Sequence, residues 1–206
     1  MEPSPKFWNI IASRYSKQAI TDEAAYQKKL KVTQEYFKPD MEVLEFGCGT
    51  GSTAIIHAPF VKHIRAIDFS AKMIDIVKAK LGQNNISNIT FEQNTIEAIS
   101  IKNESYDVVM GHSILHLLKD KEAVIARVYK LLKPGGFFVS STVCVGNTTG
   151  LFKYIAPCIK YIGLPWLTVF TSEELIESIS SHGFSIDYQW CPDNGRVAFI
   201  IGKKPE

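Results

Sequence analysis

Short apolar runs alternate with longer amphipathic stretches along the 206 residues of this sequence. The apolar runs are rich in valine, isoleucine and phenylalanine, which favour strands. Seven strands are predicted in this way, at Met41–Phe46, Ile64–Ile67, Ile89–Glu92, Tyr106–Met110, Phe137–Ser141, Phe184–Trp190 and Arg196–Ile201. Strands that alternate with helical patterns are typical of an α/β fold with a mostly parallel sheet.

Amphipathic stretches between these strands predict the helices. Two helices are expected between Pro5 and Phe37, and a short one directly after Gly51. Three more are expected from Ser70 to about Leu81, from Asp120 to Leu132, and from Thr171 to near Gly183. Ser70 is expected to cap its helix, and Thr171-Ser172-Glu173-Glu174 has the sequence of a capping box. The turn Lys133-Pro134-Gly135-Gly136 should stop the preceding helix before the next strand begins.

The last two strands are joined by Pro192-Asp193-Asn194-Gly195, which contains residues that favour a hairpin turn. We therefore expect these two strands to run antiparallel to each other. The length fits one domain with a substantial core, so residues 1–206 are expected to form a single domain. Residues 1–38 would form a helical cap at its N-terminus.

The composition is that of an ordinary globular protein, with 46% apolar and 21% charged residues. A disordered chain would have fewer apolar residues and a larger net charge. The net charge is only +2 and no dense basic run occurs, so we expect no nucleic-acid partner. The four cysteines are scattered without a C-x-x-C pair, which argues against a zinc site or a disulfide framework and favours a cytoplasmic protein.

The most apolar region lies in the segment 145–170. We expect no transmembrane helix there, because Lys153, Pro157 and Lys160 interrupt a stretch that would need about 20 mostly apolar residues to span a bilayer. The N-terminus also lacks the apolar run of a secretory signal peptide. Two interpretations stay open for this segment: a lid that lines an apolar substrate pocket and touches a membrane surface transiently, or additional core packed on the sheet.

A glycine-rich loop, Gly47-Cys48-Gly49-Thr50-Gly51, follows the first strand directly. Glycines adopt backbone angles that other residues resist, and they let a ligand approach the main chain closely. Asp68 ends the second strand, where a carboxylate can accept hydrogen bonds from both hydroxyls of a ribose. Strand, glycine loop, helix, strand and terminal acid together predict a nucleoside site. The alternative is a tight turn without a ligand, with Asp68 as a helix cap.

The charge near the loop indicates which nucleoside would bind. A dinucleotide fingerprint places a third glycine where this chain has Ser52. Glu45 lies two residues before the loop and would oppose a pyrophosphate, but it suits an ammonium or sulfonium ion. An NAD-dependent oxidoreductase is therefore the less favoured alternative.

Four motifs in the same order closely resemble those of class I S-adenosylmethionine-dependent methyltransferases. They are Val43–Ser52, Ala66–Met73, Tyr106–Met110 and Leu131–Gly136. The likeness is greatest to the small-molecule branch that includes ubiquinone and menaquinone biosynthesis enzymes. The resemblance implies a Rossmann-like three-layer sandwich with a mostly parallel seven-stranded sheet and an antiparallel C-terminal hairpin. It also implies methyl transfer from S-adenosylmethionine to a small acceptor. The apolar segment 145–170, read as a lid, suggests that this acceptor is apolar or aromatic.

The resemblance implies a set of cofactor-binding residues. Glu45 would lie near the amino group of the cofactor, Asp68 would hold its ribose, and Tyr15 on a leading helix would touch its carboxylate. The full set is Tyr15, Glu45, Gly47, Cys48, Gly49, Gly51, Asp68, Phe69, Met73, Asn94, Thr95, Ile96, Gly111 and His112. A protein that binds the cofactor without catalysis and regulates a partner is a further alternative.

Methyl transfer from a sulfonium needs little chemistry from the protein, which mainly positions the acceptor and excludes water. A base is required only when the acceptor must lose a proton. His112 and His116 are the candidates, because they are four residues apart and would share a face of a short helix. The alternative is that His112 lines the cofactor and His116 packs. No cluster of carboxylates and histidines predicts a metal.

Overall fold

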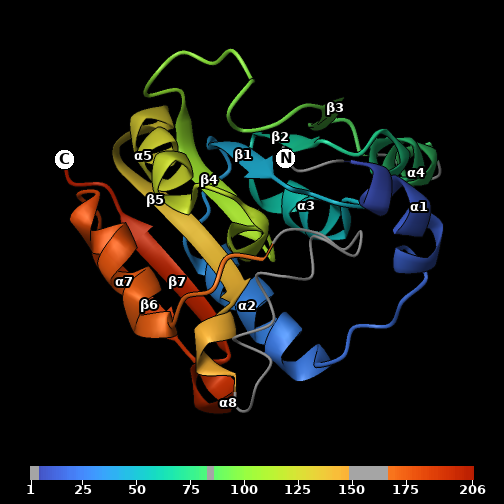
Figure 1. Ribbon diagram of the computed structural model, residues 1–206. Coiled ribbons are helices and arrows are strands. Elements are labelled where there is room, and N and C mark those ends of the chain that lie inside the picture. The colour runs from blue at the N-terminus through green and yellow to red at the C-terminus, as the bar shows by residue number, and fades with distance from the viewer. Residues whose placement is uncertain (1–4, 83–85, 149–166) are drawn as a thin grey trace. The chain divides into compact units, whose positions relative to one another are not determined.

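The computed structural model describes residues 5–82, 86–148 and 167–206. These residues group into two compact units, which we call the N-terminal unit (Pro5–Ala98) and the C-terminal unit (Ile99–Glu206). Each unit contains its own set of strands and helices (Figure 1). None of the helices that the structure describes is long and apolar enough to cross a membrane.

Three parallel strands form the sheet of the N-terminal unit, in the order β3-β2-β1. Its elements are α1 (Lys6–Tyr15), α2 (Glu23–Glu35), β1 (Glu42–Phe46), α3 (Ser52–His57), η1 (Ala58–Phe60), β2 (His63–Asp68), α4 (Ala71–Leu81) and β3 (Ile89–Gln93). Val43, Ile64 and Ile89 lie at matching positions of the three strands and are buried. The parallel register brings the ends of β1 and β2 to the same edge of this sheet.

Side chains cap the N-termini of two helices of this unit, and the cap at Ser70 is the predicted one. The side chain of Asp22 accepts a hydrogen bond from the Ala25 backbone at 2.9 Å and caps α2. Ser70 caps α4 by accepting one from the Met73 backbone at 3.2 Å. α4 buries Met73, together with Ile74 and Val77, so the predicted apolar face is confirmed.

The C-terminal unit has a mixed sheet in the order β4-β5-β7-β6. Its elements are β4 (Tyr106–His112), η2 (Leu115–Leu117), α5 (Lys121–Leu131), β5 (Leu132–Val143), η3 (Val145–Asn147), α7 (Ser172–Ser181), β6 (Ser185–Trp190), α8 (Pro192–Gly195) and β7 (Val197–Lys203). β4 and β5 are parallel, whereas β7 runs antiparallel to both β5 and β6. The expected antiparallel C-terminal pair is thereby confirmed.

Two connections in this unit differ from the sequence prediction. The segment Lys133–Gly136 belongs to β5 instead of forming a separate turn, because Gly135 and Gly136 exchange backbone hydrogen bonds with Lys204. The connection between β6 and β7 is the single helical turn α8 and not a tight hairpin turn. Proline favours the first turn of a helix, and Gly195 has a φ of 78°, which suits a chain leaving a helix.

The capping box at the start of α7 is confirmed. The Thr171 hydroxyl accepts from the Glu174 backbone at 3.1 Å, and the Glu174 carboxylate accepts from the Thr171 backbone at 2.8 Å. Before α7, the Gly146 backbone donates to the Phe170 carbonyl at 2.8 Å. Most of the predicted lid, residues 149–166, lies outside the described residues, so the lid and the single-domain organisation stay predictions.

Candidate functional site

The glycine-rich loop connects the end of β1 to the start of α3. Gly47, Gly49 and Gly51 have φ values of 65°, 53° and 71°, all in the left-handed region that glycine tolerates best. The Cys48 backbone donates to the carbonyl of Ile67 in β2 at 3.0 Å. The loop is thereby fastened to the neighbouring strand at the edge where both strands end.

Gly51 and Gly49 have different surroundings. A Cβ atom at Gly51 would lie 2.3 Å from Cγ2 of Val77 and 2.8 Å from the ring of Phe91, so no side chain fits there. Among the residues that the structure describes, a Cβ atom at Gly49 would meet only the Tyr15 ring, at 3.7 Å. The loop is therefore packed tightly against the unit's core at Gly51, while its backbone stays accessible to a small ligand beside Tyr15 at Gly49.

Asp68 holds the loop from the end of β2. Its Oδ2 accepts from the Gly49 backbone at 2.9 Å, and its Oδ1 accepts from the Ser70 backbone, also at 2.9 Å. The side chain is largely buried, which raises the pKa of its carboxyl group, whereas the two hydrogen bonds lower it. Each carboxylate oxygen has a second lone pair, so the group can still accept from two hydroxyls of a ligand.

Glu45 is the most unusual group of the unit. It is only 2% exposed, and its Oε2 has no hydrogen-bond partner among the described residues. Burial, together with the negative charge of Asp68, raises the pKa of this carboxyl group to about 8. A buried acceptor without a donor costs free energy, roughly 1–3 kcal/mol, which a cationic ligand would remove.

Replacing Glu45 with glutamine is expected to change how stability depends on pH. The folded-state pKa lies above the ordinary value of 4.5, so the contribution of Glu45 is complete below about pH 4.5 and is lost as pH rises toward 8. Within this window the wild type should lose up to about 1.4 kcal/mol per pH unit relative to Glu45→Gln. Urea unfolding at pH 5.5, 6.5 and 7.5 measures this, and parallel curves for the two proteins would contradict it.

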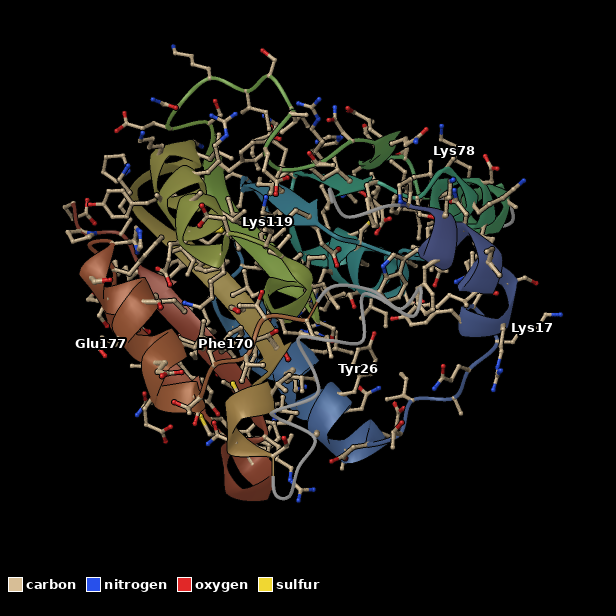
Figure 2. The ribbon with its side chains drawn as sticks, in the orientation of Figure 1. Lys17, Tyr26, Lys78, Lys119, Phe170 and Glu177 are labelled. Carbon is tan, nitrogen blue, oxygen red and sulfur yellow. The ribbon has the colours of Figure 1, made fainter. Side chains whose placement is uncertain are left out.

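Sequence reasoning missed two residues of the N-terminal unit, Tyr26 and Asn9. Tyr26 on α2, labelled in Figure 2, hydrogen-bonds Thr53 at the start of α3, and its pKa is raised by burial and by the charge of Glu45. Asn9 on α1 accepts from the Ser70 hydroxyl at 2.7 Å. The spacing of Tyr26 and Asn9 within their helices could have indicated an inward position, but not the contact made there.

The contacts of the other predicted cofactor residues of the N-terminal unit say less about the ligand. Met73 and Ile96 are buried, at 2% and 3% exposed. The Asn94 backbone donates to the Asp68 carbonyl at 3.0 Å, and the Asn94 side chain accepts from the Thr95 backbone. Phe69 is half-buried, and its carbonyl accepts from the side chain of Gln93.

In the C-terminal unit, the two candidate histidines do not share a helix. His112 is the last residue of β4 and follows Gly111, whereas His116 lies in the short helix η2. The expectation of one shared helical face is therefore wrong, because Ser113 takes a φ of 53° and turns the chain after the strand. The His116 Nδ1 lies 2.8 Å from the Thr142 hydroxyl, and burial lowers the pKa of this histidine to about 4.

The structure brings four predicted residues together in the N-terminal unit: Tyr15, Glu45, Gly49 and Asp68. The charge of Asp68, together with partial burial, raises the pKa of the Tyr15 phenol. Across the described parts of the chain, no group of three or more His, Cys, Asp or Glu side chains could hold a metal ion. The arrangement can thus hold a ligand that carries hydroxyls and a positive charge.

Comparison with known proteins agrees with this chemistry. A sequence profile described as a methyltransferase domain matches residues 37–197. A malonyl-[acyl-carrier protein] O-methyltransferase of Priestia megaterium is 30% identical in an alignment of 182 residues that covers 82% of this chain. A demethylmenaquinone methyltransferase of Leptospira interrogans is 32% identical over 111 residues, 52% of this chain. The crystal structure of the [4+2]-cyclase SpnF matches with a TM-score of 0.79 at 15% identity, covering 98% of this chain and 94% of that chain.

The likeness to the solved structure shows the fold, and it confirms the predicted seven-stranded Rossmann-like class. This chain spans 64% of the length of the Priestia relative and 45% of the Leptospira relative. The profile covers well over half of the chain. This chain therefore belongs to the class I S-adenosylmethionine-dependent methyltransferase family.

Proposed function

We propose that this protein transfers the methyl group of S-adenosylmethionine to a small acceptor that is apolar or aromatic. The observation that carries this proposal is the pair of buried carboxylates, Glu45 and Asp68, at the glycine-rich loop. Glu45 Oε2 lacks a donor within the described residues, which suits the ammonium group of the cofactor. A dinucleotide would instead place a pyrophosphate near two carboxylates, which is unfavourable.

The residues take the following roles in this proposal. Asp68 accepts from the ribose hydroxyls while it keeps the loop in place, and the loop backbone at Gly47 and Gly49 lines the methionyl part. Tyr15 covers the loop from α1 and touches the cofactor carboxylate. Phe69 and Met73 lie beside the adenine with Asn94, Thr95 and Ile96, whereas Cys48 and Gly51 shape the loop. Gly111 and His112 belong to the C-terminal unit, and the family resemblance implies that they would face the sulfonium.

S-adenosylmethionine supplies an activated methyl group when it is bound. The protein contributes by holding the acceptor in line with that group and by excluding water. His112 and His116 are the candidates for removing a proton from an acceptor that must lose one. With a pKa of about 4, His116 is neutral near pH 7 and is a weak base, so it is better suited to accept a hydrogen bond from the acceptor.

The apolar character of the acceptor rests on the sequence of residues 145–170, which we propose form a substrate lid. The names of the two relatives are consistent with a small or carrier-bound acceptor, since one acts on a malonyl group and the other on demethylmenaquinone. The second candidate is a protein that binds the cofactor without transferring its methyl group.

Calorimetry with S-adenosylhomocysteine tests the proposal. The ammonium group should lower the pKa of Glu45 from about 8, so binding at pH 7 should release close to one proton. Titrations in buffers of different ionisation enthalpy measure the proton number. We expect micromolar binding with proton release by the wild type, and binding without this proton by Glu45→Gln. Absence of binding would refute the proposal.

Transfer itself is tested with the methyl-labelled cofactor and a panel of quinols, phenols, fatty acids and acyl carrier thioesters. Labelled product from at least one apolar acceptor is expected. Tight cofactor binding without transfer to any acceptor of the panel would favour the second candidate instead.

A further inference from the structure

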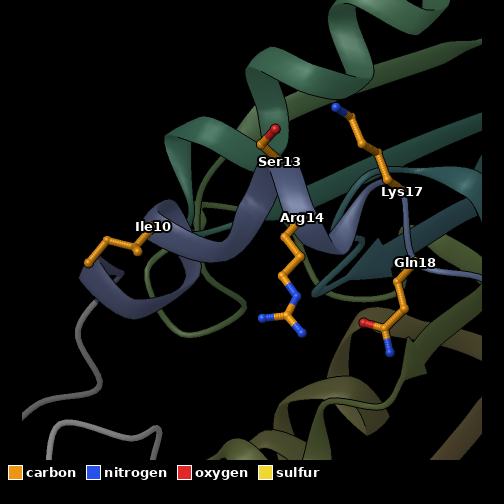
Figure 3. A pocket seen from close by; sticks show the side chains of 5 residues that line it. All are labelled: Ile10, Ser13, Arg14, Lys17 and Gln18. Carbon is orange, nitrogen blue, oxygen red and sulfur yellow. The ribbon is translucent and has the colours of Figure 1, made fainter.

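Helix α1 lies alongside α4 (Figure 1) and presents two different faces. Its outer face carries Ile10, which is 81% exposed, and the exposed Arg14 four residues later, and the exposed Lys17 follows the end of the helix. Figure 3 shows these side chains, with Ser13 and Gln18, around a surface pocket. The inner face carries the buried Ala12 and packs against α4.

Asn9 makes the polar contacts that fasten α1 to α4. Its Oδ1 accepts from the Ser70 hydroxyl at 2.7 Å and from the Lys72 backbone at 3.3 Å. Ser70 is fully buried and caps α4, because its hydroxyl accepts from the Met73 backbone. The oxygen of Asn9 thereby satisfies one further backbone donor in the first turn of α4, where such donors have no partner within the helix.

The same serine connects Asn9 to the ribose carboxylate. The Ser70 backbone donates to Asp68 Oδ1, and Asp68 Oδ2 accepts from Gly49. The connection Asn9–Ser70–Asp68–Gly49 therefore joins the leading helix to the glycine-rich loop through three hydrogen bonds of 2.7 to 2.9 Å.

Tyr15 closes this arrangement from the other end of α1. Its ring lies 3.7 Å from where a Cβ atom of Gly49 would be, above the accessible part of the loop. Asn9 and Tyr15 are on one continuous helix, so the contact that fixes Asn9 also fixes where Tyr15 lies.

We propose that Asn9 is a positioning residue for the cofactor: by docking α1 on the Ser70 cap, it holds Tyr15 over the glycine-rich loop and retains the bound cofactor. This inference rests on the proposed function and extends it, because Asn9 itself touches neither the loop nor the reacting group. Asp68 sets the geometry of the loop, and the docked helix covers it. Loss of the Asn9 contact should therefore change how fast the cofactor is released.

The test compares Asn9→Leu, Asn9→Asp and the outer-face control Ser13→Leu, with stopped-flow displacement of S-adenosylhomocysteine as the readout. Asn9→Leu removes the acceptor oxygen and should raise the release rate about 10-fold, the effect of losing roughly 1.4 kcal/mol of hydrogen bonding. Asn9→Asp keeps the oxygen next to the positive end of α4 and should stay within about 3-fold of the wild type. Ser13→Leu should behave as the wild type does.

Trypsin cleavage after Lys17 gives a second readout that a purely structural role would not move. Bound S-adenosylhomocysteine should slow this cleavage in the wild type and in Asn9→Asp, but not in Asn9→Leu. Equal release rates for Asn9→Leu and Ser13→Leu would overturn the proposal, as would cofactor protection of Asn9→Leu. A wild type that binds no S-adenosylhomocysteine overturns the proposed function, and cleavage of the unliganded variants would then still report whether Asn9 docks the helix.

Discussion

Asp68→Asn is expected to weaken binding of S-adenosylhomocysteine about 100-fold or more. A hydrogen bond to a charged group contributes about 1.5–3 kcal/mol, and in the proposed role the carboxylate accepts from two ribose hydroxyls. The loss of roughly 3 kcal/mol corresponds to about 100-fold in affinity. Calorimetry on the purified variant measures this directly.

The same substitution should also lower stability. Asp68 accepts from two backbone donors, Gly49 and Ser70, and asparagine has only one acceptor oxygen. Its amide nitrogen would face one of these donors, at a cost of about 1–3 kcal/mol in the free energy of unfolding. Asp75→Asn on the exposed side of α4 is the matched control and should change neither quantity. Unchanged affinity in a folded Asp68→Asn would contradict the assigned role.

Gly51→Ala is expected to destabilise the protein by about 2–5 kcal/mol. The left-handed backbone at Gly51 costs a non-glycine residue about 1–2 kcal/mol, and overpacking the contact with Val77 adds about 1–3 kcal/mol. Domains are stable by only about 5–15 kcal/mol, so this loss is large enough to lower the melting temperature by many degrees. Urea unfolding and thermal unfolding both measure it.

Two comparisons separate crowding from backbone strain at Gly51. Gly49→Ala has a similar φ but open space around its Cβ atom, so it should lose only the strain, about 1–2 kcal/mol. Val77→Ala opens space for a methyl group at Gly51, so the double variant should be more stable than the sum of the two single effects. Strict additivity would show that crowding against Val77 is not the cause.

Local sequence patterns predicted the parts of the fold that depend on neighbouring residues. Ser70 and Thr171 cap helices as expected, because a cap needs only a side chain and the backbone two or three residues ahead. The connection at Lys133–Gly136 was predicted less well. Whether it turns or pairs as a strand depends on Lys204, which is far away in the sequence.

In the candidate site, too, sequence patterns predicted local features but not contacts between distant residues. The glycine spacing and the strand-end position of Asp68 predicted which residues meet at the loop. The pattern did not reveal Asn9 or Tyr26, because their partners, Ser70 and Thr53, lie on other helices and only tertiary packing brings them together. The prediction that His112 and His116 share a helical face was wrong, because it assumed a helix where Ser113 turns the chain.

The most direct test of the central claim is a crystal structure of this protein with S-adenosylhomocysteine bound. We expect both ribose hydroxyls within hydrogen-bond distance of the Asp68 carboxylate and the ammonium group beside Glu45 Oε2. A ligand bound with its ribose away from Asp68, or with its ammonium group away from Glu45, would contradict the account.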